Sequence, residues 1–255
     1  MERWKTAITT SDEKNIYIRG YNVASLMKRA TFTDTIYLLH QGHLPTAAER
    51  SLFDAILIGV SDHGPAAPSA AAARIVASGN RQSLEASIAA GVLAMGDAHG
   101  GAAYECMQMI GEGIELARRE SISIKEAARR LADHAKSGRK RLPGMGHRVH
   151  TEDPRTEVLF TMARENGLAR NGIAFMQALE EAVREAIRPL PINIDGALSA
   201  VLVDLGFQPP MGKLLFIIGR VAGVTAQVME EHMREKPMRV RIPITYDGPP
   251  PREIK

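Results

Sequence analysis

Apolar residues recur at helical spacing over most of the chain. From Asn22 onward they are separated by three and four residues, which is typical of helices with one buried face. Two capping boxes, Thr46 to Glu49 and Ser123 to Glu126, mark the starts of two helices that end near residues 61 and 136. Further helices are predicted over 33–42, 66–78, 83–95, 102–110, 154–165, 172–187, 194–205 and 211–234.

Only two short stretches show the alternation typical of strands. Residues 14–21 alternate apolar and polar side chains and end at Gly20, which predicts a short strand or hairpin arm. Residues 238–245 are also strand-like, and the proline-rich tail over 247–252 is expected to be mobile. The chain is therefore predicted to be all-α, with a helical core.

Composition supports this fold class and narrows the possible functions. Aromatic residues make up only 5% of the chain, which favours helix packed on helix over sheet. The net charge of +3 is not that of a nucleic-acid-binding protein. The most apolar run, from Leu214 to Met229, is broken by Arg220 and Gln227 and is predicted to be a buried core helix.

The cysteine content and the N-terminal residues bear on location. Cys106 is the single cysteine, so no intrachain disulfide can form, and a reducing compartment is consistent with this. The first residues lead into a polar stretch without an apolar signal core. We therefore expect a cytoplasmic protein.

One glycine-rich stretch, from Leu142 to Arg155, concentrates candidate chemistry. A proline and two glycines precede His147, and such residues let backbone approach a ligand. Asp153 and Pro154 are typical of a helix N-cap and first turn, which places Arg155 at a helix start. The alternative is a surface loop with a solvated histidine and a structural arginine.

Three histidines occupy the same local setting. His63, His99 and His147 each lie beside glycine at a predicted helix end. A single such histidine is usually a capping or packing residue, but the recurrence favours a shared pocket. A zinc site is disfavoured because the three are far apart in sequence, without a second ligand at helical spacing or a nearby cysteine. No metal is expected.

Asp195 and several arginines complete the candidate residues. Asp195 begins a predicted helix among apolar neighbours, so it is either a helix cap or a base with a raised pKa. Arg220 lies within the most apolar helix and requires an anionic partner, either a structural carboxylate or a substrate. Arg239 and Arg241 alternate along the last strand-like piece, so only one of them can face a given site.

Residues 143–149, Pro-Gly-Met-Gly-His-Arg-Val, followed by Asp-Pro-Arg at 153–155, resemble the signature of the citrate synthase family. Other motifs similar to the family follow its order and span nearly the whole chain. They are Tyr17–Tyr21, Tyr37–Pro45, Asp62-His63, Ala98–Gly101, Asn193–Asp195, Gly219-Arg220 and Arg239–Arg241. The resemblance implies a citrate-synthase-like helical fold with a large and a small lobe.

One interval departs from full-length citrate synthases. Residues 45–63 form a much shorter segment, which implies a truncated large lobe. Residues 62–66, 96–97 and 193–196 look more like the citryl-CoA lyase branch, which includes the C-terminal module of ATP-citrate lyase. His99 retains the histidine of the synthases, so a short citrate or 2-methylcitrate synthase stays as the alternative. A non-catalytic CoA- or carboxylate-binding protein is disfavoured because Asp195, His99 and His147 occur together.

The resemblance implies a division of labour between residues. Asp195 is expected to move the proton of the acetyl methyl group, His99 to stabilise the enol, and His147 to act on the carbonyl of oxaloacetate or the hydroxyl of citryl-CoA. The residues expected to hold the dicarboxylate are His63, Arg155, Arg220 and Arg239. Those expected at the CoA moiety are Arg139, Arg141, Gly144, Met145 and Gly146. For the basic residues a solvated loop is an equally good interpretation.

The same resemblance implies the assembly and the ligands. The large lobe is predicted from residues 1–135 and 210–255, and the small lobe from residues 136–209. The expected substrates are oxaloacetate and acetyl-CoA or citryl-CoA, with the CoA thioester as substrate and no metal or prosthetic group. A homodimer or dimer of dimers is expected, with a C-terminal arginine reaching the partner's site and no nucleic-acid or membrane partner.

Overall fold

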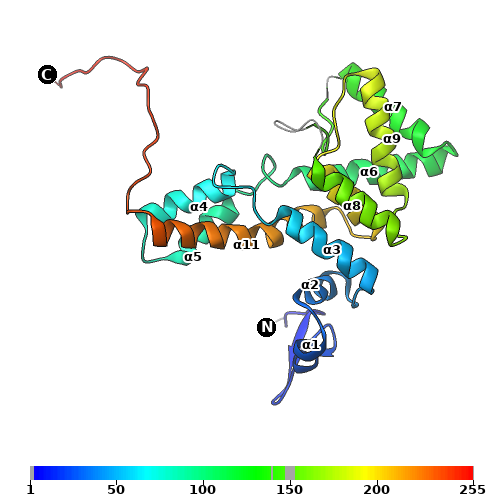
Figure 1. Cartoon of the computed structure of the whole chain (residues 1–255), viewed down its shortest axis with the longest axis horizontal. Helices are drawn as coiled ribbons and strands as arrows, with labels where there is room; N and C mark the ends of the chain where they lie inside the picture. Colours follow the sequence, from blue (N-terminus) through cyan, green and yellow to red (C-terminus); the bar gives the residue numbers. More distant parts are fainter. Residues whose placement is uncertain (1–2, 139, 147–152, 255) are drawn as a thin grey trace.

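A computed structural model describes residues 3–138, 140–146 and 153–254. Over these residues the chain is predominantly helical, which confirms the all-α prediction. The helices are α1 Val23–Arg29, α2 Phe32–Gln41, α3 Ala47–Val60, α4 Pro68–Gly79, α5 Leu84–Leu93, α6 Ala102–Glu120, α7 Ile124–Gly138, α8 Pro154–Glu165, α9 Asn171–Ala186, α10 Ile194–Asp204 and α11 Pro210–Arg234. One small sheet precedes them (Figure 1).

The strand predicted within residues 14–21 is present as β2 (Ile16–Ile18), which pairs with β3 (Tyr21–Asn22). It also pairs with β1 (Thr9–Ser11), which lies outside the predicted stretch, so the sheet is antiparallel in the order β1-β2-β3. The turn between β2 and β3 contains Arg19 and Gly20, which both have positive φ angles. Arg19 Nε and Nη2 donate to the Leu39 carbonyl at 3.1 and 2.8 Å. This contact fastens the sheet to the last turn of α2.

Local signals fix most helix ends. A capping box formed by Thr46 and Glu49 opens α3, as predicted, and Gly42 ends α2 with a φ of 83°. Helix α6 is longer than the sequence suggests, since it continues past Ile110 to Glu120. The reason is a tertiary contact: a Cβ on Gly113 would lie 2.2 Å from the Phe175 ring, so this glycine serves close packing rather than helix termination.

Helices α4 to α11 form two groups, whereas α1 and α2 lie apart from both with the N-terminal sheet (Figure 1). In one group α7 packs along α9, and α10 contacts α6, α8 and α9. In the other, α4, α5 and α11 pack together. Because α6 and α7 pack with the first group, we propose that the small lobe begins near Gly101 instead of at residue 136.

Helix α11 contacts helices of both groups. It contacts α3, α4, α5 and α6, and its buried residues include Leu215, Phe216 and Val224. By length and composition alone it is the one described helix apolar enough to cross a membrane, and half of that window is buried inside this fold. The packing fits the predicted core helix.

The predicted C-terminal strand is wrong. Residues after Arg234 form no strand in the described part of the chain, and the end of this segment extends away from the helices (Figure 1). The Met238 N–H donates to the Ser78 carbonyl at 2.9 Å, but no neighbouring described strand offers a ladder. Apolar and polar side chains do alternate over residues 238–245, but a strand also needs a partner for its backbone groups.

Two glycines on α11 let a loop lie against the helix. A Cβ on Gly219 would lie 2.6 Å from Val60 Cγ2, and one on Gly223 would lie 2.1 Å from the Ser61 carbonyl oxygen. The chain after α3 therefore runs directly over the α11 backbone. This contact carries His63 to the interface between the lobes.

We predict that Gly223→Ala lowers the free energy of unfolding by about 1–3 kcal/mol, because the added methyl group overpacks this contact. Gly111→Ala is the matched control, since no atom lies within 4 Å of its added Cβ. That substitution should raise stability by about 0.5–1 kcal/mol through helix propensity. Denaturant unfolding of both variants checks this, and equal effects at the two positions would contradict the packing argument.

Candidate active site

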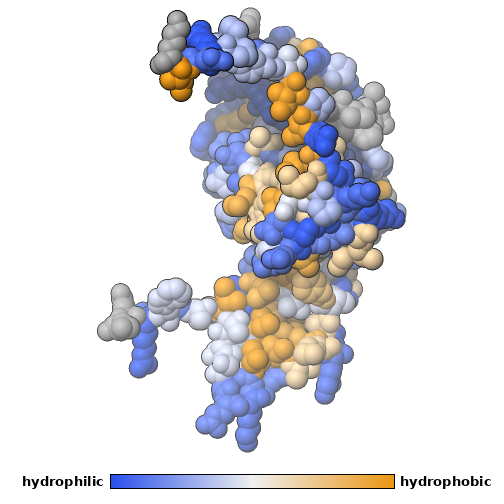
Figure 2. Space-filling view, turned by 90° about the vertical axis from the view of Figure 1, so that its left-hand side faces the viewer, coloured by the Kyte–Doolittle hydropathy of each residue, from blue (hydrophilic) through white to orange (hydrophobic). Residues whose placement is uncertain are grey.

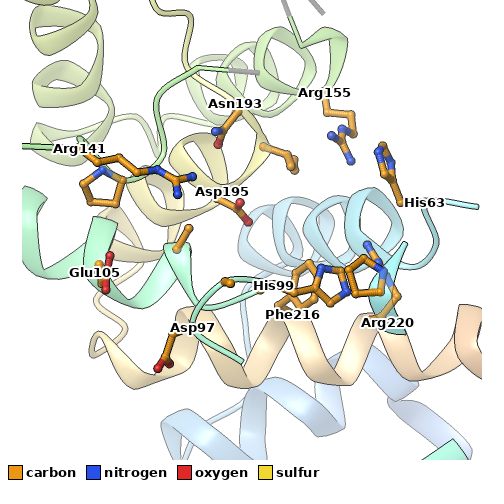
Figure 3. Close-up of a pocket in the computed structure, with 16 residues that line it drawn as sticks. His63, Asp97, His99, Glu105, Arg141, Arg155, Asn193, Asp195, Phe216 and Arg220 are labelled. Atoms are coloured by element: carbon orange, nitrogen blue, oxygen red, sulfur yellow. The ribbon is translucent and has the colours of Figure 1, made fainter. Parts of the chain in front are cut away.

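A cavity of about 360 Å³ lies where the two lobes meet (Figure 3). Six residues predicted from the sequence line it together: His63, His99, Arg141, Arg155, Asp195 and Arg220. In the view of Figure 3, the His63, Arg155 and Arg220 side chains group at one end, Arg141 and Glu105 lie at the other, and Asp195 lies between. His147 and Arg139 lie outside the described residues.

Asp195 lies in the first turn of α10, where Asn193 is the N-cap and accepts a hydrogen bond from Gly196 N at 3.1 Å. Burial raises the pKa of the Asp195 carboxyl, and the nearby Arg155 and Arg220 offset only part of that rise. A carboxyl in such a place can hold a proton at a higher pH than an exposed aspartate. This is the property required of a group that both gives and takes a proton.

The glycine-rich loop is joined to the start of α10. Gly144 has a φ of 79°, and its carbonyl accepts the Asn193 N–H at 3.0 Å. The Gly146 N–H donates to the Pro191 carbonyl at 2.7 Å, and Asn193 Nδ2 donates to the Gly146 carbonyl at 2.8 Å. A Cβ on Gly196 would lie 2.4 Å from the Gly144 oxygen. The glycines at 144 and 196 thus allow the loop that leads to His147 to lie directly against the helix that bears Asp195.

The hydrogen bonds of His99 define its tautomer. Its Nε2 lies 3.3 Å from the Ser69 amide nitrogen and 2.9 Å from Ser69 Oγ. A backbone amide can only donate, so Nε2 accepts, and we assign the proton of the neutral ring to Nδ1. Burial lowers the pKa of His99, and the charges of Arg220 and His63 lower it further. The ring is therefore neutral near pH 7 and can donate one hydrogen bond from Nδ1.

Arg220 is a buried cation on α11, with 3% of its surface exposed. Its Nε donates to the Val60 carbonyl at 2.8 Å, and its Cζ lies 4.7 Å from the centre of the Phe216 ring. Its Nη1 is buried without a hydrogen-bond partner among the described residues. Burial lowers the pKa of Arg220, but a guanidinium stays charged in proteins. The cavity therefore presents a desolvated cation with an open donor, which favours an anionic ligand.

Arg155 is held by Asp153, which is 4% exposed. Arg155 Nε and Nη2 donate to the two carboxylate oxygens at 2.9 and 2.8 Å, and Nη1 donates to the Gly59 carbonyl at 3.1 Å. Asp153 also accepts the Ile194 N–H at 3.1 Å. Burial acts to raise the pKa of Asp153, but the hydrogen bonds from Arg155 outweigh it and lower the pKa. One carboxylate thus links the start of α8, the start of α10 and α3 through its arginine.

Sequence reasoning missed several residues of this site. Asp153 was predicted only as an N-cap, and Ser69, Phe216 and Asn193 were not assigned roles. Phe216 precedes Arg220 by four residues and so lies on the same face of α11, a signal that the sequence did offer. The contact between Ser69 and His99 joins positions 30 residues apart, and no local sequence pattern predicts it.

Arg239 does not line the cavity. It forms an ion pair with Glu231, which is fully buried and also binds Arg74, and its Nε lies 3.0 Å from Glu235. These contacts fix Arg239 at the far end of α11. Arg241 follows in the exposed C-terminal segment.

Comparison with known proteins places this geometry in a family. The profile "Citrate synthase, C-terminal domain" matches residues 2–53 and 46–241. The chain belongs to the citrate synthase family. Putative citrate synthase 2 of Mycobacterium tuberculosis is 31% identical over 208 residues, which cover 78% of this chain and 52% of that protein. The citrate synthase of Heyndrickxia coagulans is 29% identical over 207 residues, with 79% and 52% covered. The chain spans about half the length of these curated relatives.

Solved structures show the same fold. The structure described as citryl-CoA lyase from Hydrogenobacter thermophilus is 40% identical, covers 100% of this chain and 98% of its own, and superposes with a TM-score of 0.91. ATP citrate lyase from Methanothrix soehngenii shares the fold at 20% identity and a TM-score of 0.83, over 98% of this chain and 42% of that one. The citrate-synthase-like fold predicted from the sequence is confirmed.

Two aspartates of the site should respond to pH with opposite signs. Above the ordinary value of 3.8, Asp195 ionises in the unfolded chain while the folded protein keeps the proton, so wild-type stability falls until the raised pKa is passed. We expect the difference in Tm, Asp195→Asn minus wild type, to increase with pH over that window.

Asp153→Asn is the matched control. The lowered pKa of Asp153 stabilises the folded protein above 3.8, and this contribution is lost as the pH falls through the folded value. The difference in Tm, Asp153→Asn minus wild type, should therefore become more negative as the pH rises towards 3.8. Slopes of the same sign for both variants, measured by thermal unfolding across pH 2–8, would contradict the assigned environments.

Proposed function

We propose that this protein is a citryl-CoA lyase, which cleaves citryl-CoA to acetyl-CoA and oxaloacetate through an enol intermediate. One observation carries the proposal: the half-buried carboxyl of Asp195, whose pKa is raised, and the desolvated guanidinium of Arg220 line the same cavity. The 40% identity to a citryl-CoA lyase over the whole chain supports it.

The cationic end of the cavity suits the carboxylates of the oxaloacetate moiety. Arg220 offers a buried donor, and Arg155 and His63 lie at the same end (Figure 3). Arginine gives charge-assisted, geometrically defined contacts to carboxylates. A dicarboxylate bound here would supply the partner that Arg220 lacks. Its attraction to the cation would offset the free-energy cost of having removed that cation from water.

Asp195 and His99 suit the thioester moiety. When the carbon–carbon bond of citryl-CoA breaks, the electron pair passes to the acetyl-CoA enolate, whose oxygen bears the developing charge. His99 Nδ1–H would donate to that oxygen, where a fixed dipole is most effective. Asp195 in its protonated form would then give its proton to the enol carbon. The raised pKa of Asp195 favours that protonated form.

The proton of the citryl hydroxyl group must leave as the ketone forms. By resemblance to the family, His147 takes it, and the described loop up to Gly146 leads to that residue. Arg141 lines the opposite end of the cavity from Arg220 in Figure 3 and is the proposed contact of the CoA moiety. Gly144, Met145 and Gly146 would present backbone near it, and Arg139 is expected to add positive charge to this end.

A short citrate or 2-methylcitrate synthase is the second candidate, supported by the synthase relatives at 29% and 31% identity. The two functions differ in one step, hydrolysis of citryl-CoA. Given citryl-CoA, a lyase releases oxaloacetate without added nucleotide or metal. We expect that purified protein does this faster than it releases free thiol from acetyl-CoA plus oxaloacetate. Thiol release as fast as cleavage would make the protein a synthase.

We also propose a homodimer in which the C-terminal segment of one chain reaches the cavity of the other. Large hydrophobic side chains are exposed on the described chain, as Figure 2 shows for one face, and such surface is commonly covered by another copy. They include Leu93 on α5 and Ile242 and Ile244 in the C-terminal segment. Because Arg239 is paired within its own chain, Arg241 is the better candidate for the arginine that crosses. A cytoplasmic location remains our expectation.

Mixing inactive Arg241→Ala protein with inactive Asp195→Asn protein tests the shared site. If the arginine acts across the interface, each mixed dimer has one site without either lesion. Random exchange should then restore about a quarter of wild-type activity. Arg239→Ala is the control variant, because the ion-pair partners of Arg239 lie in its own chain and this arginine is not expected to act across the interface. No recovery with Arg241→Ala after demonstrated subunit exchange would mean that each site belongs to one chain.

A further inference from the structure

Phe216 makes contacts with both ends of the proposed chemistry. It lies one turn before Arg220 on α11, is 6% exposed and lines the cavity. The Arg220 guanidinium lies over its face at 4.7 Å, and the His99 ring meets it edge-on with centroids 5.5 Å apart and planes at 84°. The same ring also touches the chain between the lobes, since a Cβ on Gly100 would lie 2.4 Å from its Cδ1.

Arg220 has little else to fix its orientation. Its one described hydrogen bond leaves from Nε to the Val60 carbonyl, and no ion pair to a described carboxylate holds the rest of the group. Two carboxylates are near enough to attract it electrostatically, Asp62 and Asp195. A guanidinium that turned towards Asp195 would pair with the proposed proton donor and would close the anion site.

The aromatic ring opposes that movement. Its face attracts the cation, and in a desolvated place this attraction is larger than at a surface. The same ring packs against the His99 imidazole in a T-shaped arrangement, and Ser69 holds that imidazole at Nε2. Leucine would fill part of the same volume but has no π face.

We propose that Phe216 is a positioning residue. It holds Arg220 away from Asp195, and it fixes His99 on the opposite side of the cavity from Asp195. This inference rests on the proposed function for its consequences in catalysis. Its geometric part, the placement of two side chains by one ring, does not depend on that function.

The titration of His99 reports on this placement. Arg220 from α11 and His63 from the loop after α3 act on it electrostatically. The other charged residues that line the same cavity are Asp97, Glu105, Arg141, Arg155 and Asp195. In the wild type, burial, Arg220 and His63 lower its pKa from 6.5. If Arg220 moves away, its contribution falls, and the pKa of His99 rises towards 6.5.

The test compares three variants of the full chain. Phe216→Leu removes the ring, Phe216→Tyr keeps it, and Phe207→Leu removes an equally buried ring that stacks on Phe53 outside the cavity. The readouts are the dissociation constant of oxaloacetate by calorimetry and the titration of His99 by NMR, assigned with His99→Gln. For Phe216→Leu we expect affinity to fall about tenfold and the His99 titration to move upward. Phe216→Tyr should keep most of the wild-type affinity for oxaloacetate and most of the wild-type His99 titration. Phe207→Leu should change neither the affinity nor the titration.

Equal effects of Phe216→Leu and Phe207→Leu would overturn the proposal, because they would show a loss of general packing. Loss of affinity without a shift of His99 would also overturn it, since Arg220 and His99 would not be positioned together. A wild-type protein that neither binds oxaloacetate nor cleaves citryl-CoA would overturn the proposed function instead. The His99 titration would then decide the positioning role alone.

Discussion

The arrangement of the cavity depends on one buried cation, Arg220, for which the described residues provide too few hydrogen-bond partners. Removing a guanidinium from water is unfavourable unless an anion or hydrogen bonds compensate, and Arg220 keeps a buried Nη1 without a described partner. Neighbouring features fit around this group. Gly219 lets Val60 approach closely enough for its carbonyl to accept from Nε, and Phe216 covers one face of the side chain. The fold thus holds a cation ready for a ligand.

The electrostatics of the cavity couple the binding of an anion to the two proton-handling groups. Arg155 and Arg220 lower the pKa of Asp195, against the larger effect of burial, and Arg220 also lowers that of His99. A dicarboxylate that neutralises these cations would remove both contributions. The pKa of Asp195 would then rise further, and the proton needed for the enol carbon would be held more firmly in the substrate complex. Substrate binding would in this way help to set the protonation state that the proposed cleavage requires.

The sequence revealed those parts of the site that depend on local chemistry. Glycines and helix caps in the sequence indicate that His63, His99 and Asp195 lie at helix ends. An arginine inside an apolar helix predicts a buried cation. Contacts between distant segments were not accessible in the same way. The pairing of Arg239 with Glu231, the hydrogen bond from Ser69 to His99 and the extension of α6 beyond Gly111 all depend on which helices meet. The strand predicted over residues 238–245 is absent for the same reason, because alternation of apolar and polar residues does not show whether a neighbouring strand is available.

The central claim, that Arg220 is kept for a substrate carboxylate, is tested most directly by thermal unfolding with and without oxaloacetate. A ligand at free concentration L that binds only the folded protein stabilises it by RT ln(1 + L/Kd), so Tm rises with both the concentration and the affinity of the ligand. We predict a concentration-dependent rise for the wild type and none for Arg220→Met, with both proteins folded in the absence of ligand. An equal rise in Arg220→Met would contradict the claim, because oxaloacetate would then bind without the buried guanidinium.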